Sequence, residues 1–239
     1  MSAKPAIDFP AVLLAGGFGT RLRSVFPDLP KPLAPVRGRP FIAYLLDQLV
    51  TAGFTRAILC LHYKSEQIIG ALGRNHGHLK LEYSVEPEPL GTGGAVRLAL
   101  SHVNAPRLLV MNADSFCAAP LADFISFHRA HGQPASITSV HVPDTARYGR
   151  LELAADGRVR SFTEKNVASG AGFINAGIYI LEHGLVEGIP TGRPVSLETE
   201  MFPAWLPLGL TAWKTSAPFI DIGTPESYAQ VETYLNARD

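Results

Sequence analysis

The sequence predicts an α/β protein in which one sheet is flanked by helices within a single domain. Short apolar runs typical of buried strands alternate with segments of helical periodicity through the first half of the chain. The first apolar run leads directly into a glycine-rich loop, an arrangement that lets backbone N–H groups bind anions beside a sheet. The 239 residues, 46% of them hydrophobic, suffice for one substantial core.

In the first half, the predicted elements follow the order of a doubly wound parallel sheet. Apolar residues recur at helical spacing from Phe41 to Val50, and Gly53 is expected to end that helix. Thr92 is expected to cap a later helix. We expect strands at residues 11–14, 57–61, 79–85 and 107–112, and further helices at 66–72 and 92–100.

The second half changes character toward antiparallel pairing. Asp156-Gly157 is a strong signal for a hairpin turn between strands at 148–153 and 158–163. Asn175 and Gly177 lie inside a predicted strand, where glycine often marks the close approach of a ligand or another backbone. Thr224 and Pro225 are expected to open the last helix. We expect further strands at 136–142, 171–181, 210–214 and 217–221, and further helices at 121–130 and 196–202.

Composition excludes several functional classes. Lys plus Arg equals Asp plus Glu at 21 each, so no global field attracts nucleic acid or an anionic membrane. Cys60 and Cys117 have no metal-ligand spacing and are expected to be reduced thiols. The N-terminus lacks an apolar signal segment, and no apolar stretch approaches the roughly 20 residues of a membrane span. A cytoplasmic location is therefore expected.

The strongest functional signal is the glycine-rich loop after the first strand. Three glycines in four positions let backbone N–H groups approach a ligand, and anionic oxygens are natural ligands of such a loop. Arg21 and Lys31 add two positive charges suited to phosphate oxygens. No Walker A Gly-Lys-Ser/Thr occurs, and Leu22 stands where the dinucleotide-binding fingerprint has its third glycine, so neither motif is present.

Two aspartates occupy equivalent places in the predicted sheet. Asp114 follows the strand at 107–112 and Asp221 ends the strand at 217–221, so both are expected at the ligand-facing edge. Carboxylates pair well with Mg²⁺, which prefers substrate phosphates to an all-protein cage. A second glycine cluster at residues 91–94 would let a flat base lie against the backbone, although a tight turn explains it equally well.

These motifs, in this order, resemble those of the sugar-1-phosphate nucleotidylyltransferases over nearly the whole chain. That family has a mixed α/β sandwich related to the Rossmann type, and it joins a nucleoside triphosphate to a sugar 1-phosphate with release of pyrophosphate. Its short D-glycero-α-D-manno-heptose 1-phosphate guanylyltransferases, whose product feeds capsule and surface-polysaccharide assembly, look most similar. The shared motifs are Gly16-Gly17-Phe18-Gly19-Thr20-Arg21-Leu22, Pro30-Lys31-Pro32, Leu90-Gly91-Thr92-Gly93-Gly94, Asn112-Ala113-Asp114, Phe162-Thr163-Glu164-Lys165, Asn175-Ala176-Gly177-Ile178-Tyr179 and Phe219-Ile220-Asp221-Ile222-Gly223-Thr224-Pro225.

The resemblance implies a role for each matching residue. Arg21 and Lys31 would grip the triphosphate, Lys165 would bind the sugar phosphate, and these three cations would be catalytic. Asp114 and Asp221 would hold Mg²⁺. Residues 1–115 would form a nucleotide-binding half and residues 116–239 a sugar-phosphate-binding half of one domain. The nucleotide, expected to be GTP, would contact Ala15, Gly16, Gly17, Gly19, Thr20, Gly91, Thr92 and Asn112, and the sugar would contact Glu164, Asn175 and Glu198.

Several alternatives remain open at this point. The base and sugar rest on resemblance alone, so uridylyl transfer is possible, as are mannose, glucose or N-acetylmuramic acid 1-phosphate as acceptors. A glycosyltransferase commonly holds its metal with Asp-x-Asp, whereas residues 112–114 contain one acid. A non-catalytic regulator that binds nucleotide sugars is a further alternative. Residues 204–208 form an apolar stretch that could bury against a second copy, and the chain's end near the last helix predicts no β-helix or cupin extension.

Overall fold

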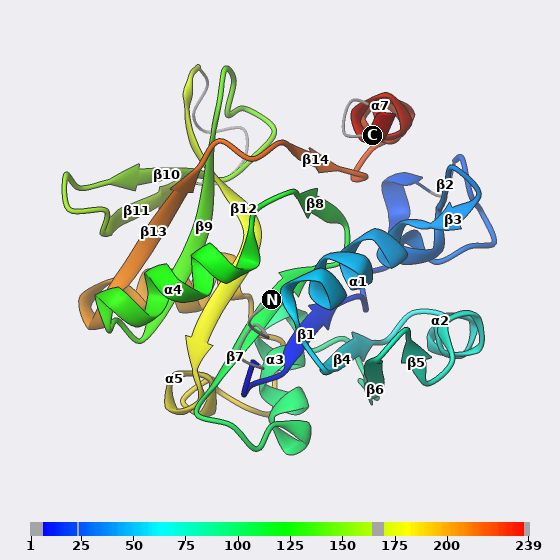
Figure 1. Ribbon diagram of the computed structural model, residues 1–239, viewed down its shortest axis with the longest axis horizontal. Helices are drawn as coiled ribbons and strands as arrows, with labels where there is room; N and C mark the ends of the chain where they lie inside the picture. The colour runs from blue at the N-terminus through cyan, green and yellow to red at the C-terminus, as the bar shows by residue number, and fades with distance from the viewer. Residues whose placement is uncertain (1–6, 23, 164–169, 237–239) are drawn as a thin grey trace, which may run out of the picture.

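A computed structural model of the chain describes residues 7–22, 24–163 and 170–236. Within these residues, ten strands form one sheet that runs through the molecule (Figure 1). The strands are β1 Ala11–Leu14, β4 Arg56–Leu61, β5 Asn75–His76, β6 Leu79–Val85, β7 Arg107–Asn112, β9 Ala135–Val142, β10 Arg150–Leu153, β11 Val159–Thr163, β12 Gly172–Glu182 and β13 Leu210–Thr215. Their order is β11-β10-β12-β7-β1-β4-β6-β5, with β9 paired to both β12 and β13.

The four strands β6, β4, β1 and β7 pair in parallel and form the centre of the sheet. Helices cover both faces, which explains why β1, β4 and β7 are almost continuously apolar. Successive side chains point to opposite faces: Leu13 packs into one hydrophobic cluster and Val12 into the other. The first cluster includes α1 Phe41–Ala52, α4 Leu121–His131 and α7 Pro225–Asn236; the second includes α3 Gly91–Ala99, α5 His183–Glu187 and α6 Phe202–Trp205.

The long strand β12 joins the parallel centre to an antiparallel extension. It runs antiparallel to β7 along its second half and to β10 along its first half, while β9 pairs with it on the other side. The pairing of β12 with β9 shifts register between Asn175 and Tyr179. β10 and β11 form the predicted hairpin, in which Gly157 has a positive φ of 85°.

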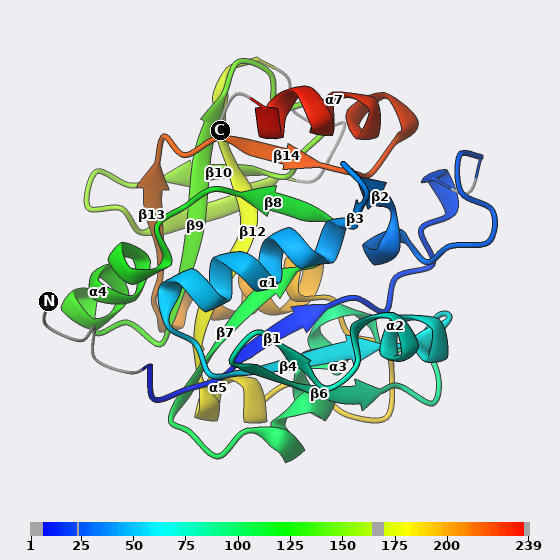
Figure 2. The same ribbon diagram turned by 45° about the vertical axis from the view of Figure 1, so that its right-hand side comes forward.

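A small two-stranded sheet lies outside the main sheet; one predicted metal ligand, Asp221, ends one of its strands, and the other, Asp114, directly precedes its other strand. β8 (Ser115–Cys117) pairs antiparallel with β14 (Phe219–Asp221), and α7 follows β14 directly (Figure 2). Thr224 caps α7 by accepting a hydrogen bond from the Ser227 N–H, as expected. The remaining elements are β2 Pro35–Val36, β3 Arg39–Pro40, α2 Ser65–Leu72, short 3-10 turns at 20–22, 31–33, 100–102 and 206–208, and a π-helical turn Leu197–Met201.

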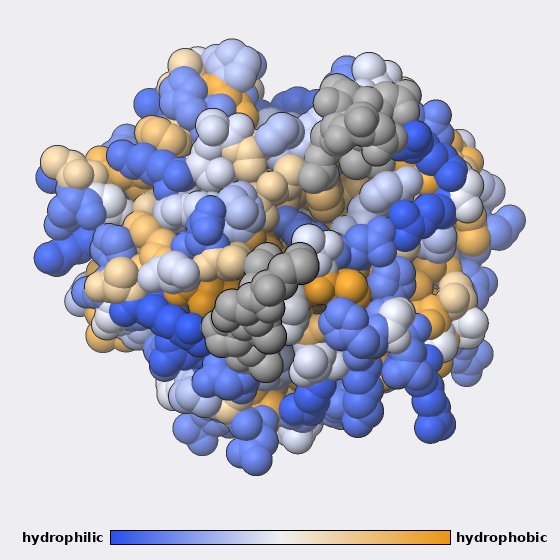
Figure 3. Space-filling model, viewed as in Figure 1, coloured by the Kyte–Doolittle hydropathy of each residue, from blue (hydrophilic) through white to orange (hydrophobic). Residues whose placement is uncertain are grey.

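The predicted fold class is confirmed, while one local expectation is wrong. Thr92 is not the N-cap of α3, because that helix already begins at Gly91 and no side chain caps it. In the apolar stretch at 204–208, Ala204, Pro207 and Leu208 are exposed, whereas Trp205 is buried in the core. Hydrophilic residues line most of the rim of the face in Figure 3, with smaller hydrophobic areas between them. Among the residues described, no helix has the length and apolarity needed to cross a bilayer.

Candidate active site

A cleft of about 1120 Å³ opens at the carboxyl ends of the parallel strands. Leu14, His62, Glu86 and Asn112, which end or follow β1, β4, β6 and β7, line its base. A smaller pocket of about 180 Å³ adjoins the cleft. The residues that line both are Leu14, Gly17, Arg21, Asp114 and Gly223, so the two spaces adjoin across a shared wall.

The glycine-rich loop forms the wall between the two spaces. Gly19 has a φ of 59° and lies against Lys31, so a Cβ at this position would sit only 3.0 Å from the Lys31 Cβ. Gly16 lies against the other side of the site, where a Cβ would be 2.9 Å from Glu86 Oε1. Phe18, 45% exposed, packs its ring against His62 and Tyr63. The glycines therefore allow a close approach to both neighbouring walls.

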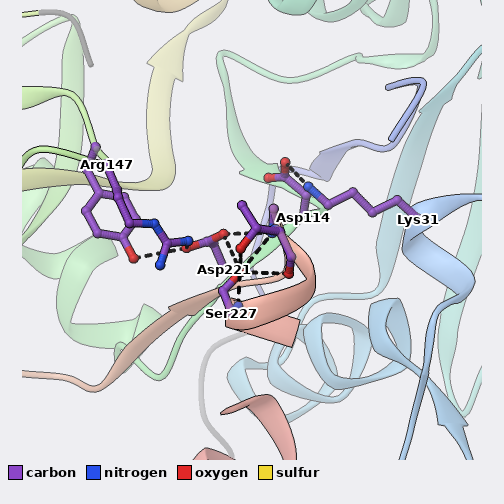
Figure 4. A network of polar contacts seen from close by, with 8 residues as sticks. Lys31, Asp114, Arg147, Asp221 and Ser227 are labelled. Carbon is purple, nitrogen blue, oxygen red and sulfur yellow. Dashed lines mark hydrogen bonds and ion pairs between the residues drawn. The ribbon is translucent and has the colours of Figure 1, made fainter. Parts of the chain in front are cut away.

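Two cation–carboxylate pairs lie side by side in the site (Figure 4). Lys31 Nζ donates to Asp114 Oδ2 over 2.8 Å, and Arg147 Nη2 lies 3.4 Å from Asp221 Oδ2. Tyr148 also donates to Asp221 Oδ2, over 3.0 Å. Burial, followed by the nearby Asp221 charge, raises the pKa of Tyr148 to about 12. Tyr148 therefore stays a neutral donor at physiological pH.

The pairing of β8 with β14 explains why Asp114 and Asp221 are neighbours. Asp221 is in register with Ser115, and the Ile222 N–H donates to the Asp114 carbonyl over 2.9 Å. The Asp221 carboxylate is further held by the Gly223 N–H at 2.7 Å and by the Ser227 hydroxyl at 3.1 Å. Its side chain is 17% exposed, against 52% for Asp114. Asp221 is thus a firmly oriented carboxylate and Asp114 a more accessible one.

The glycines at 91–94 allow a distant segment of the chain to pack closely against α3, a structural explanation that the sequence left open. Gly91 has a φ of 71°, and a Cβ there would lie 2.5 Å from the Val195 carbonyl oxygen. The Val195 carbonyl also accepts the Gly93 N–H over 2.8 Å. Thr92 Oγ1 donates to Glu198 Oε2 over 2.7 Å and accepts the Leu197 N–H over 2.8 Å. The glycines let the segment carrying Glu198 approach α3, while Gly91 and Thr92 still line the cleft.

Two side-chain amides that line the cleft contact a buried tyrosine. The Tyr179 hydroxyl accepts hydrogen bonds from the side-chain amides of Asn175, at 2.8 Å, and Asn112, at 3.5 Å. Burial raises the pKa of Tyr179, so its hydroxyl stays protonated. Gly177, with a φ of 74°, sits where β12 changes register, and a Cβ there would lie 2.9 Å from Ser115 Oγ. The predicted close approach at Gly177 is therefore found, here to another strand.

Every predicted site residue within the described part of the chain lines the cleft or the small pocket. Their roles in binding and catalysis stay predictions. Lys165 and Glu164 lie outside the described residues. The cleft holds Gly16, Gly17, Arg21, Gly91, Thr92, Asn112, Asp114, Asn175, Glu198 and Asp221, and the small pocket holds Ala15, Gly17, Gly19, Thr20, Arg21, Lys31 and Asp114.

Glu86, Arg147 and Tyr148 are among the polar residues of the cleft that were not predicted from the sequence. Glu86 is 7% exposed and lines the cleft, and its Oε2 accepts the Leu90 N–H over 2.9 Å. Burial raises the pKa of this carboxyl. Glu86 directly follows β6, so the strand-end rule that found Asp114 could have found it. Arg147 and Tyr148 lie in a loop before Gly149, where no periodic pattern marks them.

The charges that line the site fit a divalent cation. Of the described residues, four carboxylates line the cleft or pocket (Glu86, Asp114, Glu198 and Asp221) against three cations (Arg21, Lys31 and Arg147). A site with excess negative charge would repel phosphates unless a cation joined them. Within the described ranges, no three His, Cys, Asp or Glu residues are grouped to hold a metal alone. Carboxylates completed by substrate phosphates match the coordination that Mg²⁺ prefers.

Comparisons with known proteins agree with this geometry. A family model described as nucleotidyl transferase matches residues 10–238. The mannose-1-phosphate guanylyltransferase of Mycobacterium tuberculosis is 35% identical over 224 residues, which cover 92% of this chain and 62% of that protein. The mannose-1-phosphate guanyltransferase of Pichia angusta is 37% identical over 226 residues, 91% of this chain and 61% of the relative. The chain thus spans less than two thirds of the length of these curated relatives.

Solved structures show the same architecture over almost the whole chain. HddC from Yersinia pseudotuberculosis superposes with a TM-score of 0.86 and 38% sequence identity, over 95% of this chain and 99% of that one. A second crystal structure of the same HddC, complexed with GMP-PN, superposes with a TM-score of 0.85.

Proposed function

Because the chain belongs to the nucleotidyl transferase family, we propose that it transfers GMP from GTP to a sugar 1-phosphate and releases pyrophosphate. The observation that carries this proposal is that the glycine loop, Arg21 and Lys31 line two adjoining spaces together with Asp114 and Asp221. The relatives named as guanylyltransferases and the neighbour complexed with GMP-PN support it.

The proposed reaction needs no nucleophile from the protein. An ionised phosphate oxygen of the sugar 1-phosphate attacks the α-phosphorus of GTP, and the bond from that phosphorus to the β-phosphate bridging oxygen breaks. Pyrophosphate takes the bonding electrons, and the nucleotide sugar is the second product. The barrier comes from bringing two anions together, so catalysis consists of in-line positioning and charge neutralisation.

The roles proposed for individual residues follow from their places in the site. Backbone N–H groups of the glycine loop, from Gly16 to Thr20, surround the triphosphate and ribose, while the Ala15 N–H donates to the Cys60 carbonyl and fixes the start of the loop. Arg21 and Lys31, which line the small pocket, neutralise the phosphates, and Lys165 is assigned to the sugar phosphate by resemblance. Asp114 and Asp221 would hold Mg²⁺, which would neutralise phosphate charge when bound. Tyr148 and Ser227 keep the Asp221 carboxylate oriented.

We assign the preference for guanine to Glu86, a buried residue that lines the cleft. An ionised carboxylate only accepts hydrogen bonds, and guanine presents two adjacent donors, N1–H and N2–H, on its pairing edge. When ionised, Glu86 offers such a carboxylate, with Oε1 next to Gly16 and Oε2 bonded to the Leu90 N–H. Because burial raises the pKa of Glu86, this contact forms at pH values above that raised pKa. Gly91 and Thr92 contribute backbone contacts to the base, since the Thr92 hydroxyl is already bonded to Glu198.

The acceptor is proposed to be a sugar 1-phosphate of manno configuration, with Asn112, Asn175 and Glu198 around its hydroxyls and Glu164 assigned there by resemblance. The sequence motifs favour D-glycero-α-D-manno-heptose 1-phosphate, which would make GDP-heptose. The names of the curated relatives favour mannose 1-phosphate as the second candidate.

A matrix of four nucleoside triphosphates against several sugar 1-phosphates, read by pyrophosphate release, tests the function. We expect release with GTP and a manno-configured acceptor to exceed every other combination. Glu86→Gln, whose amide carries both a donor and an acceptor, should lower kcat/KM for GTP relative to UTP. Calorimetric binding of a nucleotide sugar without any turnover in the matrix would instead identify a regulator.

A further inference from the structure

One arginine of the cleft has no role in the function proposed so far. Arg147 lies on the turn between β9 and β10 and lines the cleft beside Tyr148 and Gly149. Of the described residues, the only lysines or arginines that line the large cleft are Arg21 and Arg147. Arg21 also lines the small pocket beneath the glycine loop, whereas Arg147 does not. The two guanidinium groups therefore come from separate segments of the chain: Arg21 from the turn after the glycine loop, with its Nη2 3.7 Å from where a Cβ at Gly223 would lie, and Arg147 from the turn before β10.

The turn that carries Arg147 is firmly anchored. Asp144 Oδ1 accepts the backbone N–H groups of Ala146, at 3.1 Å, and Gly170, at 3.2 Å. The Thr145 N–H donates to the Gly170 carbonyl over 3.0 Å, and the Tyr148 N–H donates to the Thr145 carbonyl over 2.9 Å. These bonds fix the backbone on both sides of Arg147. Its side chain, by contrast, is 51% exposed.

The contact between Arg147 and Asp221 can be exchanged without leaving Asp221 unsatisfied. The Arg147 to Asp221 distance is 3.4 Å, the longest contact of that carboxylate among the described residues. If Arg147 turns toward another anion, Tyr148, Gly223 and Ser227 still donate to Asp221. The guanidinium is thus held over the cleft by a weak exposed ion pair, and a phosphate could replace the carboxylate as its partner.

We propose that Arg147 binds the phosphate of the sugar 1-phosphate, an inference that rests on the function proposed above. The incoming phosphate must attack in line with the leaving pyrophosphate, so it needs a cation away from the glycine loop that is proposed to hold the triphosphate. Among the described residues, Arg147 is the cation that lines the large cleft without also lining the pocket of the glycine loop. Its planar fork can hold two phosphate oxygens while a third attacks the α-phosphorus, and it partly neutralises the repulsion between the two substrates.

Steady-state kinetics of Arg147→Ala and Arg147→Lys test this assignment. With GTP saturating, we expect Arg147→Ala to raise KM for the sugar 1-phosphate by roughly 10- to 100-fold, the effect of losing a hydrogen bond to a charged group. KM for GTP should stay within about threefold. Arg147→Lys should recover part of the loss, because a point charge replaces the fork.

Arg158→Ala is the matched control. Arg158 is also an exposed arginine of the second half, paired with Asp156 at 3.1 Å, and it lines neither the cleft nor the pocket. This variant should keep both wild-type KM values. An unchanged KM for the sugar 1-phosphate in Arg147→Ala, or an equal rise in both KM values, would overturn the assignment while wild-type turnover upholds the function. No pyrophosphate release from the wild-type protein would overturn both.

Discussion

At the scale of single residues, Lys31 has the clearest consequence for activity. Its side chain is only 10% exposed and lines the small pocket next to Gly19 of the glycine loop, with Nζ 2.8 Å from Asp114 Oδ2. We expect Lys31→Ala to lower kcat/KM for pyrophosphate release by about 10²–10³, the usual cost of removing one preorganised electrostatic donor. The unfolding midpoint in urea should stay close to wild type, because Asp114 remains accessible to water.

Lys80→Ala provides the control for Lys31. Lys80 is likewise ion-paired, to Glu82 at 3.3 Å, but it is 64% exposed on β6 and lines neither space of the site. The control should keep the wild-type rate. A folded Lys31→Ala protein with the activity of Lys80→Ala would show that Lys31 does not act on the phosphates.

His128 links the protonation of a buried residue to stability. It is 2% exposed in α4 and contacts Ser136 at 2.8 Å and Glu182 at 3.1 Å. Burial lowers its pKa below the ordinary 6.5, against the opposing effect of Glu182. Below pH 6.5 the unfolded chain therefore binds a proton more readily than the folded chain, so the free energy of unfolding falls as the pH falls toward the folded pKa.

This linkage is measured by urea unfolding at neutral pH and at several values below 6.5. We expect His128→Gln to lose part of the wild-type decline in unfolding free energy at acid pH. His131→Gln, which removes a neighbouring histidine of α4 outside this network, is the matched comparison. Identical pH slopes for wild type and His128→Gln would contradict the linkage.

Among the site residues, Asp114 and Asp221 could be predicted from the sequence, whereas Arg147 could not. Asp114 and Asp221 were found because each ends an apolar strand, and open sheets place ligands there. Arg147 could not be found in this way: it lies in a loop, and its approach to Asp221 depends on the pairing of β8 with β14. The β8 strand has only three residues, too few for a periodic signal.

At the scale of elements, the strands and helices were predictable because their apolar residues follow clear periods. The strand at 79–85 and the strand at 107–112 were predicted with the bounds that the structure has. The second glycine cluster shows the opposite case. Glycines permit close approach, but the approaching group here is the backbone of Val195, about a hundred residues away along the chain. Sequence alone offers no means of choosing between that backbone and a base.

The contact between α3 and the segment at Val195 predicts a stability effect. Gly91→Ala places a Cβ 2.5 Å from the Val195 carbonyl and forces a side chain into a φ of 71°. We expect a loss of about 1–3 kcal/mol in the free energy of unfolding, measured by urea denaturation. Gly70→Ala is the control, because Gly70 lies inside α2 and a Cβ at that position would have no neighbouring atom within 4 Å. That change should stabilise by about 0.5–1 kcal/mol. Equal effects of the two substitutions would refute the packing argument.

At the scale of the whole molecule, the site forms where the parallel centre meets the added strands. β1 and β7 present the glycine loop and Asn112, β12 presents Asn175, and the β8–β14 pair brings Asp221 beside Asp114. Acidic side chains exceed basic ones among the described residues that line the site. The architecture thus gathers carboxylates where two phosphorylated substrates are proposed to meet, and a divalent cation bound there would balance their charge.

The charge balance of the site predicts that the reaction requires divalent cations. Removal of divalent ions with EDTA should abolish pyrophosphate release and weaken GTP binding in calorimetry, and added Mg²⁺ should restore both. Asp221→Asn should raise the Mg²⁺ concentration needed for half-maximal rate by roughly 10-fold or more, whereas Asp156→Asn, an exposed aspartate outside the site, should leave it unchanged. The required Mg²⁺ concentration should rise because the amide oxygen of Asn carries no net charge. Tyr148 and Ser227 can still hold the side chain at position 221 in place. Full turnover in EDTA would mean that Arg21, Lys31 and Arg147 neutralise the phosphates unaided, and the carboxylates would then serve only to orient those cations.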